Sequence, residues 1–211
     1  HVTVRAAAFE MTALWLAAVI LAYRFGLAFQ LMIGASLFLG VLYSLPPVKL
    51  KGKPLLDALA NAFGYGLVNF TAGWLIFRPF QWGLAGIFLP YLLSIGAVFV
   101  NTAVVDLEGD RRAGEKTTAV FLGPALSFVL SVLLMTAACA AAFAKKELVC
   151  LVPSALSLPL FIAAAAYYFI TNEVNRRLTV ASFRLPGLLF TLIAGYLFWP
   201  YLIFLALVVA G

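Results

Sequence analysis

Residues 84–105 read LAGIFLPYLLSIGAVFVNTAVV and residues 148–171 read LVCLVPSALSLPLFIAAAAYYFIT, and neither run contains an acidic or basic side chain. A helix of about 20 apolar residues crosses a hydrocarbon core roughly 30 Å thick, so each run is long enough to span a membrane. Apolar residues do not alternate with polar ones here, as they do in the strands of a membrane β-barrel. The two runs predict an all-α fold with membrane-spanning helices.

The composition of the whole chain agrees with this interpretation. Hydrophobic residues make up 65% of the 211 residues and charged residues 10%, whereas a soluble domain carries roughly 25% charged residues. Such a chain cannot bury its apolar side chains inside a water-soluble core. We therefore expect a multi-pass integral membrane protein, with residues 1–211 forming a single polytopic helical bundle and no soluble domain between the spans.

Turn-forming and charged residues divide the chain into apolar segments. The longest break is predicted at residues 172–184, before the last span. That span contains Pro200, and a proline inside a helix kinks or breaks it. The pattern predicts seven transmembrane helices, at residues 5–23, 27–44, 55–77, 84–105, 120–143, 148–170 and 185–209.

The positive charges predict how these helices are oriented. Threading the chain alternately across the membrane places ten of its 14 Lys and Arg residues on one side, the side of the amino end. Because cytoplasmic loops are enriched in Lys and Arg, the amino end is predicted to be cytoplasmic. The net charge of +6 then reflects topology, since the bases are dispersed and lack the interleaved aromatic residues of a nucleic-acid surface. No nucleic-acid partner is expected.

Four of the eight acidic residues fall in one short stretch, DLEGDRRAGE at residues 106–115. If the helix continues from the preceding span, Asp106 and Asp110 are one turn apart on one face, whereas Glu108 projects from another. Two like charges on one face at a membrane boundary repel each other unless a cation lies between them, and Mg²⁺ prefers such oxygen ligands. An alternative stays open: both aspartates could pair with the bases at Arg111, Arg112 or Lys116.

A second charged stretch, YSLPPVKLKGKP at residues 43–54, follows the second span. Pro46 and Pro47 stop the helix, and the turn that follows places Lys49, Lys51 and Lys53 near the membrane surface. These ammonium groups could bind a diphosphate, or they could only set the topology and attract anionic lipid headgroups. The residues alone leave both interpretations open.

The two stretches together resemble the UbiA superfamily of intramembrane prenyltransferases. YSLPPVKLK, residues 43–51, is similar to the family's tyrosine and lysine loop, and DLEGDRRAGEKTTAVFLG, residues 106–123, to its second aspartate-rich motif. The family has nine transmembrane helices and a first aspartate-rich motif after the second helix. The opening HVTVRAAAF resembles the segment that follows that first motif. The resemblance implies that the seven spans correspond to helices three to nine, with half of the metal site cut from the amino end.

The resemblance also implies a function. We expect Mg²⁺-dependent transfer of an isoprenyl group from a prenyl diphosphate to a membrane-associated acceptor, an aromatic compound or a quinone precursor. This activity is expected of the complete gene product and not of these 211 residues alone. The implied metal ligands are Asp106, Asp110 and Glu108, of which Glu108 projects from another face of the helix. The implied diphosphate-binding residues are Lys49, Lys51, Arg111, Lys116 and Tyr43.

Three asparagines within the apolar segments are further candidates. Asn61, Asn69 and Asn101 are costly in a membrane unless they face a cavity or a neighbouring helix. Each could contact substrate or form a packing hydrogen bond. Two other functions also stay open: a membrane transporter, disfavoured because the mid-span regions lack charged residues, and a non-catalytic family member that binds lipid or assists assembly.

Overall fold

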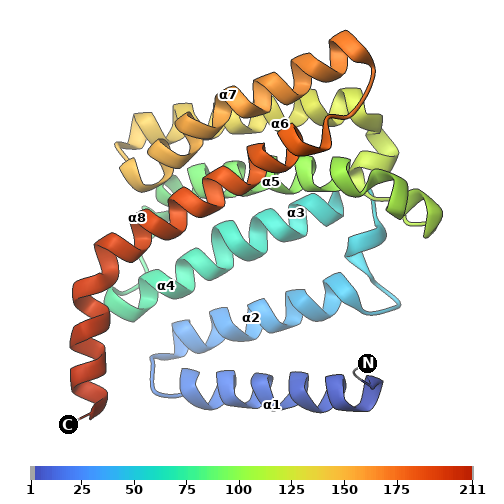
Figure 1. Ribbon diagram of the computed structural model, residues 1–211. Helices are drawn as coiled ribbons and strands as arrows, with labels where there is room; N and C mark the ends of the chain where they lie inside the picture. Colours follow the sequence, from blue (N-terminus) through green and yellow to red (C-terminus); the bar gives the residue numbers. More distant parts are fainter. Residues whose placement is uncertain (1–2, 211) are drawn as a thin grey trace.

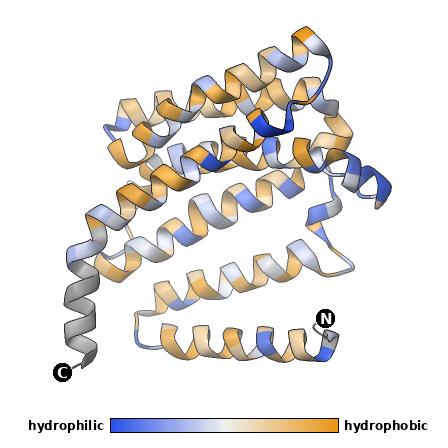
Figure 2. Ribbon diagram, in the orientation of Figure 1, coloured by the Kyte–Doolittle hydropathy of each residue, from blue (hydrophilic) through white to orange (hydrophobic). Residues whose placement is uncertain are grey.

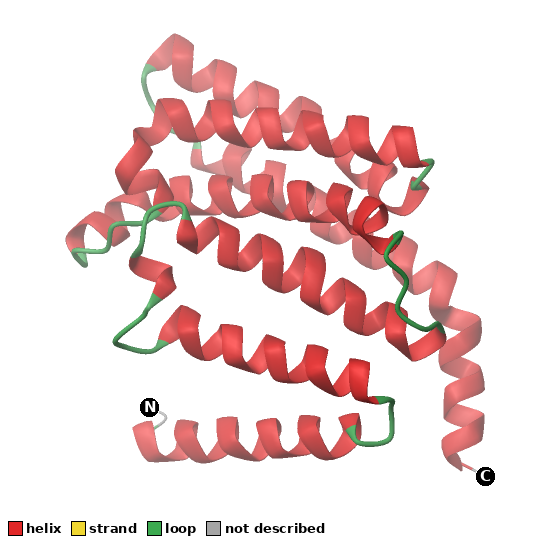
Figure 3. Ribbon diagram, turned by 180° about the vertical axis from the view of Figure 1, so that it is seen from behind, coloured by secondary structure: helices red, strands yellow, loops and turns green. Residues whose placement is uncertain are grey.

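The computed structural model describes residues 3–210, with the side chains of Val4, Phe198 and residues 201–210 left undescribed. Within this range all regular structure is helical, and Figure 3 shows helices joined by short connections. The α-helices are α1 (Val4–Ala22), α2 (Leu27–Ser44), α3 (Leu56–Phe63), α4 (Phe70–Phe77), α5 (Leu84–Arg112), α6 (Thr118–Lys145), α7 (Leu148–Thr171) and α8 (Arg176–Ala210). A 3-10 turn, η1 (Leu50–Gly52), precedes α3, and a π-helical segment, η2 (Gly64–Asn69), joins α3 to α4.

The predicted all-α membrane fold is confirmed. Six of the described helices are long and apolar enough to cross a membrane. The predicted span at residues 55–77 corresponds to the uninterrupted helical path α3–η2–α4, which the π segment divides into three elements. At 1.5 Å per residue this path is also long enough to span a hydrocarbon core.

One predicted boundary is wrong. The break expected at residues 172–184 shortens to residues 172–175, because α8 begins at Arg176 and not near residue 185. Asn175 starts the helix by accepting a hydrogen bond from the amide of Leu178 through its side-chain Oδ1 at 3.1 Å. The charges of Arg176, Arg177 and Arg184 suggested a loop, but a helix end that leaves the membrane carries such charges equally well. Pro200 does not end α8, which bends toward its carboxyl end in Figure 1.

Taking α3–η2–α4 as one helical path, successive helices lie side by side (Figure 1), and among the described elements α1 packs against α2 alone. The α2–α3, α5–α6 and α7–α8 connections all lie at the end of the bundle where the chain begins. Hydrophilic residues gather at these connections, whereas the helices between the two ends are largely hydrophobic (Figure 2). The alternate threading predicted from the sequence therefore holds, and the acidic stretch and the lysine stretch share one end.

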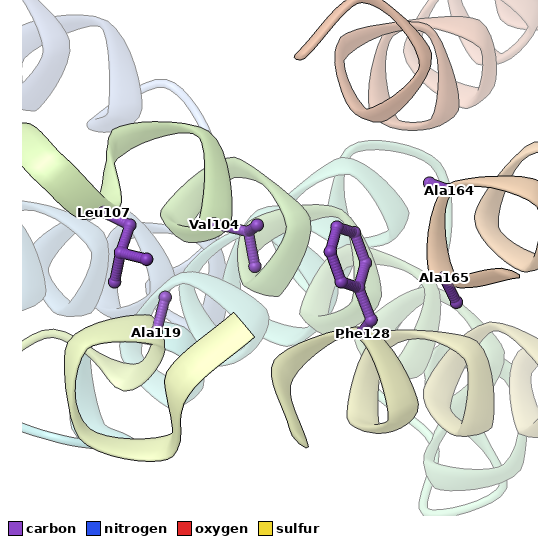
Figure 4. Close-up of a cluster of buried hydrophobic side chains, with 6 residues drawn as sticks. All are labelled: Val104, Leu107, Ala119, Phe128, Ala164 and Ala165. Carbon is purple, nitrogen blue, oxygen red and sulfur yellow. The ribbon is translucent and has the colours of Figure 1, made fainter. Parts of the chain in front are cut away.

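A hydrophobic cluster fixes α5 against α6 and α7 close to that end. Val104 and Leu107 of α5 face Ala119 and Phe128 of α6, and Ala164 and Ala165 of α7 complete the cluster (Figure 4). Val104 and Leu107 are three residues apart and occupy one face of α5. The packing therefore turns a different face of α5, the one that carries Asp106 and Asp110, toward α2 and α3.

The π segment η2 lies against the backbone of α5. Gly66 is buried, and a Cβ atom added there would lie 2.5 Å from the Cα atom of Leu92. Only glycine allows so close an approach. The contact holds the two helical paths together at the level of the widened π turn.

Candidate active site

A cavity of about 240 Å³ lies among the charged residues at one end of the bundle. Residues from α2, η1, α3, α5 and the start of α6 surround it, and we call it the acidic cavity. Its lining residues are Tyr43, Lys51, Asp57, Ala58, Asn61, Phe99, Thr102, Ala103, Asp106, Asp110 and Thr117. Five of the predicted site residues thus meet around one space: Tyr43, Lys51, Asn61, Asp106 and Asp110.

Asp106 and Asp110 lie one turn apart on α5, which continues without interruption to Arg112. Both side chains line the acidic cavity. Among the described residues neither aspartate forms an ion pair, since the one ion pair there joins Lys49 to Glu115. The alternative in which nearby bases neutralise the two aspartates is therefore not what the structure shows.

A hydrogen bond holds the side chain of Asp110 in its orientation. Thr117, at the start of α6, donates its hydroxyl to Oδ2 of Asp110 at 3.0 Å. Thr117 is itself buried, with 4% of its surface exposed. The carboxylate is therefore positioned before any ligand binds, which favours a site for a bound cation or substrate.

The next residue, Thr118, is held by an acid that the sequence analysis did not select. Asp57 of α3 is buried, with 6% of its surface exposed. Its Oδ2 atom accepts a hydrogen bond from the backbone amide of Thr118 at 2.9 Å. Its Oδ1 accepts the Thr118 hydroxyl and the amide of Ala58. Asp57 thereby caps the first turn of α6 from a different helix. A signal was present: an acid four residues before Asn61 in an apolar helix marks a polar face.

Two further contacts tie the α2–α3 connection to the α5–α6 connection. Lys49 pairs with Glu115, and the amide of Leu55 donates to the Thr118 hydroxyl at 3.0 Å. Lys49 and Leu55 have positive φ angles of 39° and 64°, and residues other than glycine rarely adopt this backbone conformation. The ties hold this strained connection over the acidic cavity.

The other predicted basic and acidic residues lie away from the cavity. Lys49 is engaged with Glu115 and does not line it. Arg111 and Lys116 are exposed and do not line it either. Glu108 is exposed on another face of α5, as its spacing predicts. Its backbone carbonyl oxygen accepts a hydrogen bond from Nε of Arg112 at 3.2 Å. Of the predicted diphosphate-binding residues, Lys51 and Tyr43 are the ones placed to meet a ligand in this cavity.

The three asparagines separate into two groups. Asn101 is fully buried and donates to Ser182 of α8 at 2.9 Å, so it packs one helix against another. Asn61 lines the acidic cavity and also a second cavity of about 210 Å³. Asn69 lines the second cavity, which we call the amide cavity, and its Oδ1 accepts the Ser36 hydroxyl at 3.2 Å.

The donor set of the acidic cavity fits Mg²⁺. In the described part of the chain no group of three or more His, Cys, Asp or Glu side chains could hold a metal alone. Mg²⁺ does not need such a group, because it is usually held by one or two carboxylates together with substrate phosphate oxygens. Asp106 and Asp110 would supply the carboxylates, whereas both oxygens of Asp57 are already bonded to Thr118.

Comparison with known proteins gives the family. The model of the UbiA prenyltransferase family matches residues 1–185, most of the chain. The protein belongs to this family. The fold agrees: a UbiA homologue from Archaeoglobus fulgidus, solved with GPP and Mg²⁺ bound, superposes with a TM-score of 0.62 at 22% identity, covering 90% of this chain and 69% of that one.

Curated relatives of this UbiA family member have different names. Digeranylgeranylglyceryl phosphate synthase of Methanobrevibacter smithii is 33% identical over 110 residues, 49% of this chain and 37% of that protein. Homogentisate phytyltransferase of Synechocystis is 33% identical over 131 residues, 57% of this chain and 41% of that protein. Lycopene elongase/hydratase of Haloferax volcanii is 37% identical over 93 residues, 43% of this chain and 29% of that protein. The chain thus matches less than half the length of each relative.

Proposed function

We propose that the protein transfers an isoprenyl group from a prenyl diphosphate to a lipophilic, membrane-associated acceptor, with Mg²⁺ bound by Asp106 and Asp110. The observation that carries this proposal is the acidic cavity, which is lined by Lys51 and by two carboxylates that have no basic partner in the described structure. A diphosphate with its cation complements that arrangement: the carboxylates bind the cation and the ammonium group binds phosphate oxygens. Membership of a prenyltransferase family supports the same assignment.

In the proposed reaction the bond between C1 of the prenyl group and the diphosphate oxygen breaks, and the electron pair leaves with the diphosphate. The acceptor forms a new bond to C1 and loses a proton. Mg²⁺, when bound, would stabilise the charge that develops on the leaving diphosphate. Lys51 would bind the same group as a point charge, Thr117 keeps Asp110 oriented, and Phe99 provides an apolar wall where the prenyl group meets the cavity.

We propose an aromatic compound or a quinone precursor as the acceptor. Of the three relatives named above, the one whose match extends over the most residues is named for homogentisate, an aromatic acid. We further propose that the end of the bundle carrying the acidic cavity faces the cytoplasm. Threading the chain alternately across the membrane places ten of the 14 Lys and Arg residues on that side, and cytoplasmic loops are enriched in these residues.

The test uses the complete gene product in nanodiscs and measures Mg²⁺-dependent binding of radiolabelled geranyl diphosphate. Asp106→Asn and Asp110→Asn each remove one carboxylate from the cavity and should weaken binding by about tenfold or more, since a charge-assisted contact contributes roughly 1.5–3 kcal/mol. Glu108→Gln is the matched control, because it neutralises an acid on the same helix that does not line the cavity. Wild-type affinity in both aspartate variants would refute the metal site.

A further inference from the structure

The amide cavity lies between two helical faces in the membrane-spanning part of the bundle. On α2 it is lined by Ser36, Leu39, Gly40 and Tyr43, which follow the spacing i, i+3, i+4, i+7 of a single helix face. Gly40 has open space beside it, where a Cβ atom would meet nothing within 4 Å. The face of α2 that looks toward α3 and η2 is therefore hollow and partly polar.

The opposite wall depends on the π segment. Asn61, Gly64, Tyr65 and Asn69 line the cavity, with the spacing i, i+3, i+4, i+8. In a regular α-helix the residue at i+7 lies almost in line with residue i, whereas the residue at i+8 lies about 80° around the axis, at the edge of the face. The π turns of η2 accommodate about one extra residue, which brings Asn69 back onto the face of Asn61. π segments of this kind occur frequently at functional sites.

Two hydrogen-bonding groups of this cavity have no partner among the described residues. Asn69 accepts from Ser36 through Oδ1, and its Nδ2 atom makes no hydrogen bond there. The hydroxyl of Tyr65 also makes none, although its ring stacks on Phe99 with centroids 5.8 Å apart. A hydrocarbon chain in this space would leave both groups unsatisfied within the membrane, which is unfavourable. A ligand with an oxygen atom would satisfy them.

The amide cavity also adjoins the acidic cavity, because Tyr43 and Asn61 line both. We infer that the amide cavity binds the hydroxyl- or carbonyl-bearing part of the acceptor, beside the carbon at which the diphosphate leaves. This inference rests on the proposed prenyl transfer for the identity of the ligand as the acceptor. Asn69, Ser36 and Tyr65 would be the residues that select an oxygen-bearing ligand over a pure hydrocarbon.

The test compares two probes of nearly equal shape, 1-naphthol and 1-methylnaphthalene, which differ by a hydroxyl in place of a methyl group. The complete gene product in nanodiscs is dialysed against each probe, and binding to empty nanodiscs is subtracted. Wild-type protein should bind 1-naphthol more tightly. Asn69→Leu and Tyr65→Phe should each weaken naphthol binding about fivefold, as expected for one lost hydrogen bond, and leave methylnaphthalene binding unchanged.

Thr136→Val is the matched control, because this exposed threonine of α6 donates only to the carbonyl of Val132 in its own helix. It should retain wild-type preference for 1-naphthol. Equal binding of the two probes by wild-type protein, or an unchanged preference in both Asn69→Leu and Tyr65→Phe, would overturn the inference. Geranyl diphosphate binding in the same samples separates the two proposals: its absence with naphthol preference intact refutes prenyl transfer and the acceptor role, but not the oxygen-selective cavity.

Discussion

Asp57→Asn is the substitution whose effect follows most directly from the structure. The carboxylate accepts three hydrogen bonds, from the amide and hydroxyl of Thr118 and from the amide of Ala58. Asparagine has nearly the same shape but replaces one oxygen by an NH₂ group, which cannot accept from Thr118. One charge-assisted hydrogen bond is lost, and two donors then face each other in a buried site. We expect the free energy of unfolding to fall by about 2 kcal/mol.

The free energy of unfolding can be measured by titrating purified protein in mixed micelles with a denaturing detergent. Glu10→Gln is a suitable control, because it neutralises an exposed acid of α1 and should change stability by less than about 0.5 kcal/mol. Thr118→Val completes a double-mutant cycle, and the coupling energy with Asp57→Asn should be at least about 1 kcal/mol. A coupling energy near zero, or wild-type stability of Asp57→Asn, would show that the Asp57–Thr118 contact does not anchor α6.

Three further predictions test other parts of the site. Lys51→Ala should weaken geranyl diphosphate binding about tenfold, whereas Lys49→Ala should mainly lower stability, because Lys49 pairs with Glu115 and does not line the cavity; equal binding defects would contradict this division. Gly66→Ala should destabilise the protein by about 1–3 kcal/mol in the same unfolding titration, because its Cβ would lie 2.5 Å from the α5 backbone, whereas Gly73→Ala, with open space, should not. Cysteines at Lys51 and Lys146 should react with a membrane-impermeant maleimide from opposite sides, and labelling from the same side would refute the topology.

The part of the site that was predictable from sequence lies within single helices. Asp106 and Asp110 are four residues apart on a helix, and their shared face follows from the helical period. Helix length and hydropathy likewise predict where spans occur, because the membrane has a fixed thickness. These features depend on local periodicity, and the structure confirms them.

The remaining features depend on contacts between distant segments, which one sequence does not reveal. Asp57 and Thr118 are separated by 61 residues, and nothing in either local pattern indicates that they meet. The close approach of Gly66, in the π segment, to the backbone of α5 is equally hidden, because it joins segments that are distant in the sequence. The early start of α8 was missed for a different reason: charges at a helix end resemble charges in a loop when hydropathy alone is considered.

The three lysines of the α2–α3 connection show how such contacts divide similar residues among different roles. Lys49 and Leu55 are both tied to the α5–α6 connection, through Glu115 and Thr118. Lys51 lies between these two anchors and lines the acidic cavity, and Lys53 is exposed and does not line it. Because the anchors restrict the connection on both sides of Lys51, its ammonium group loses less freedom on binding a ligand than a lysine on a free loop would. The charge of Lys49 thus supports the site by bonding to Glu115, and the charge of Lys51 is left available to a diphosphate.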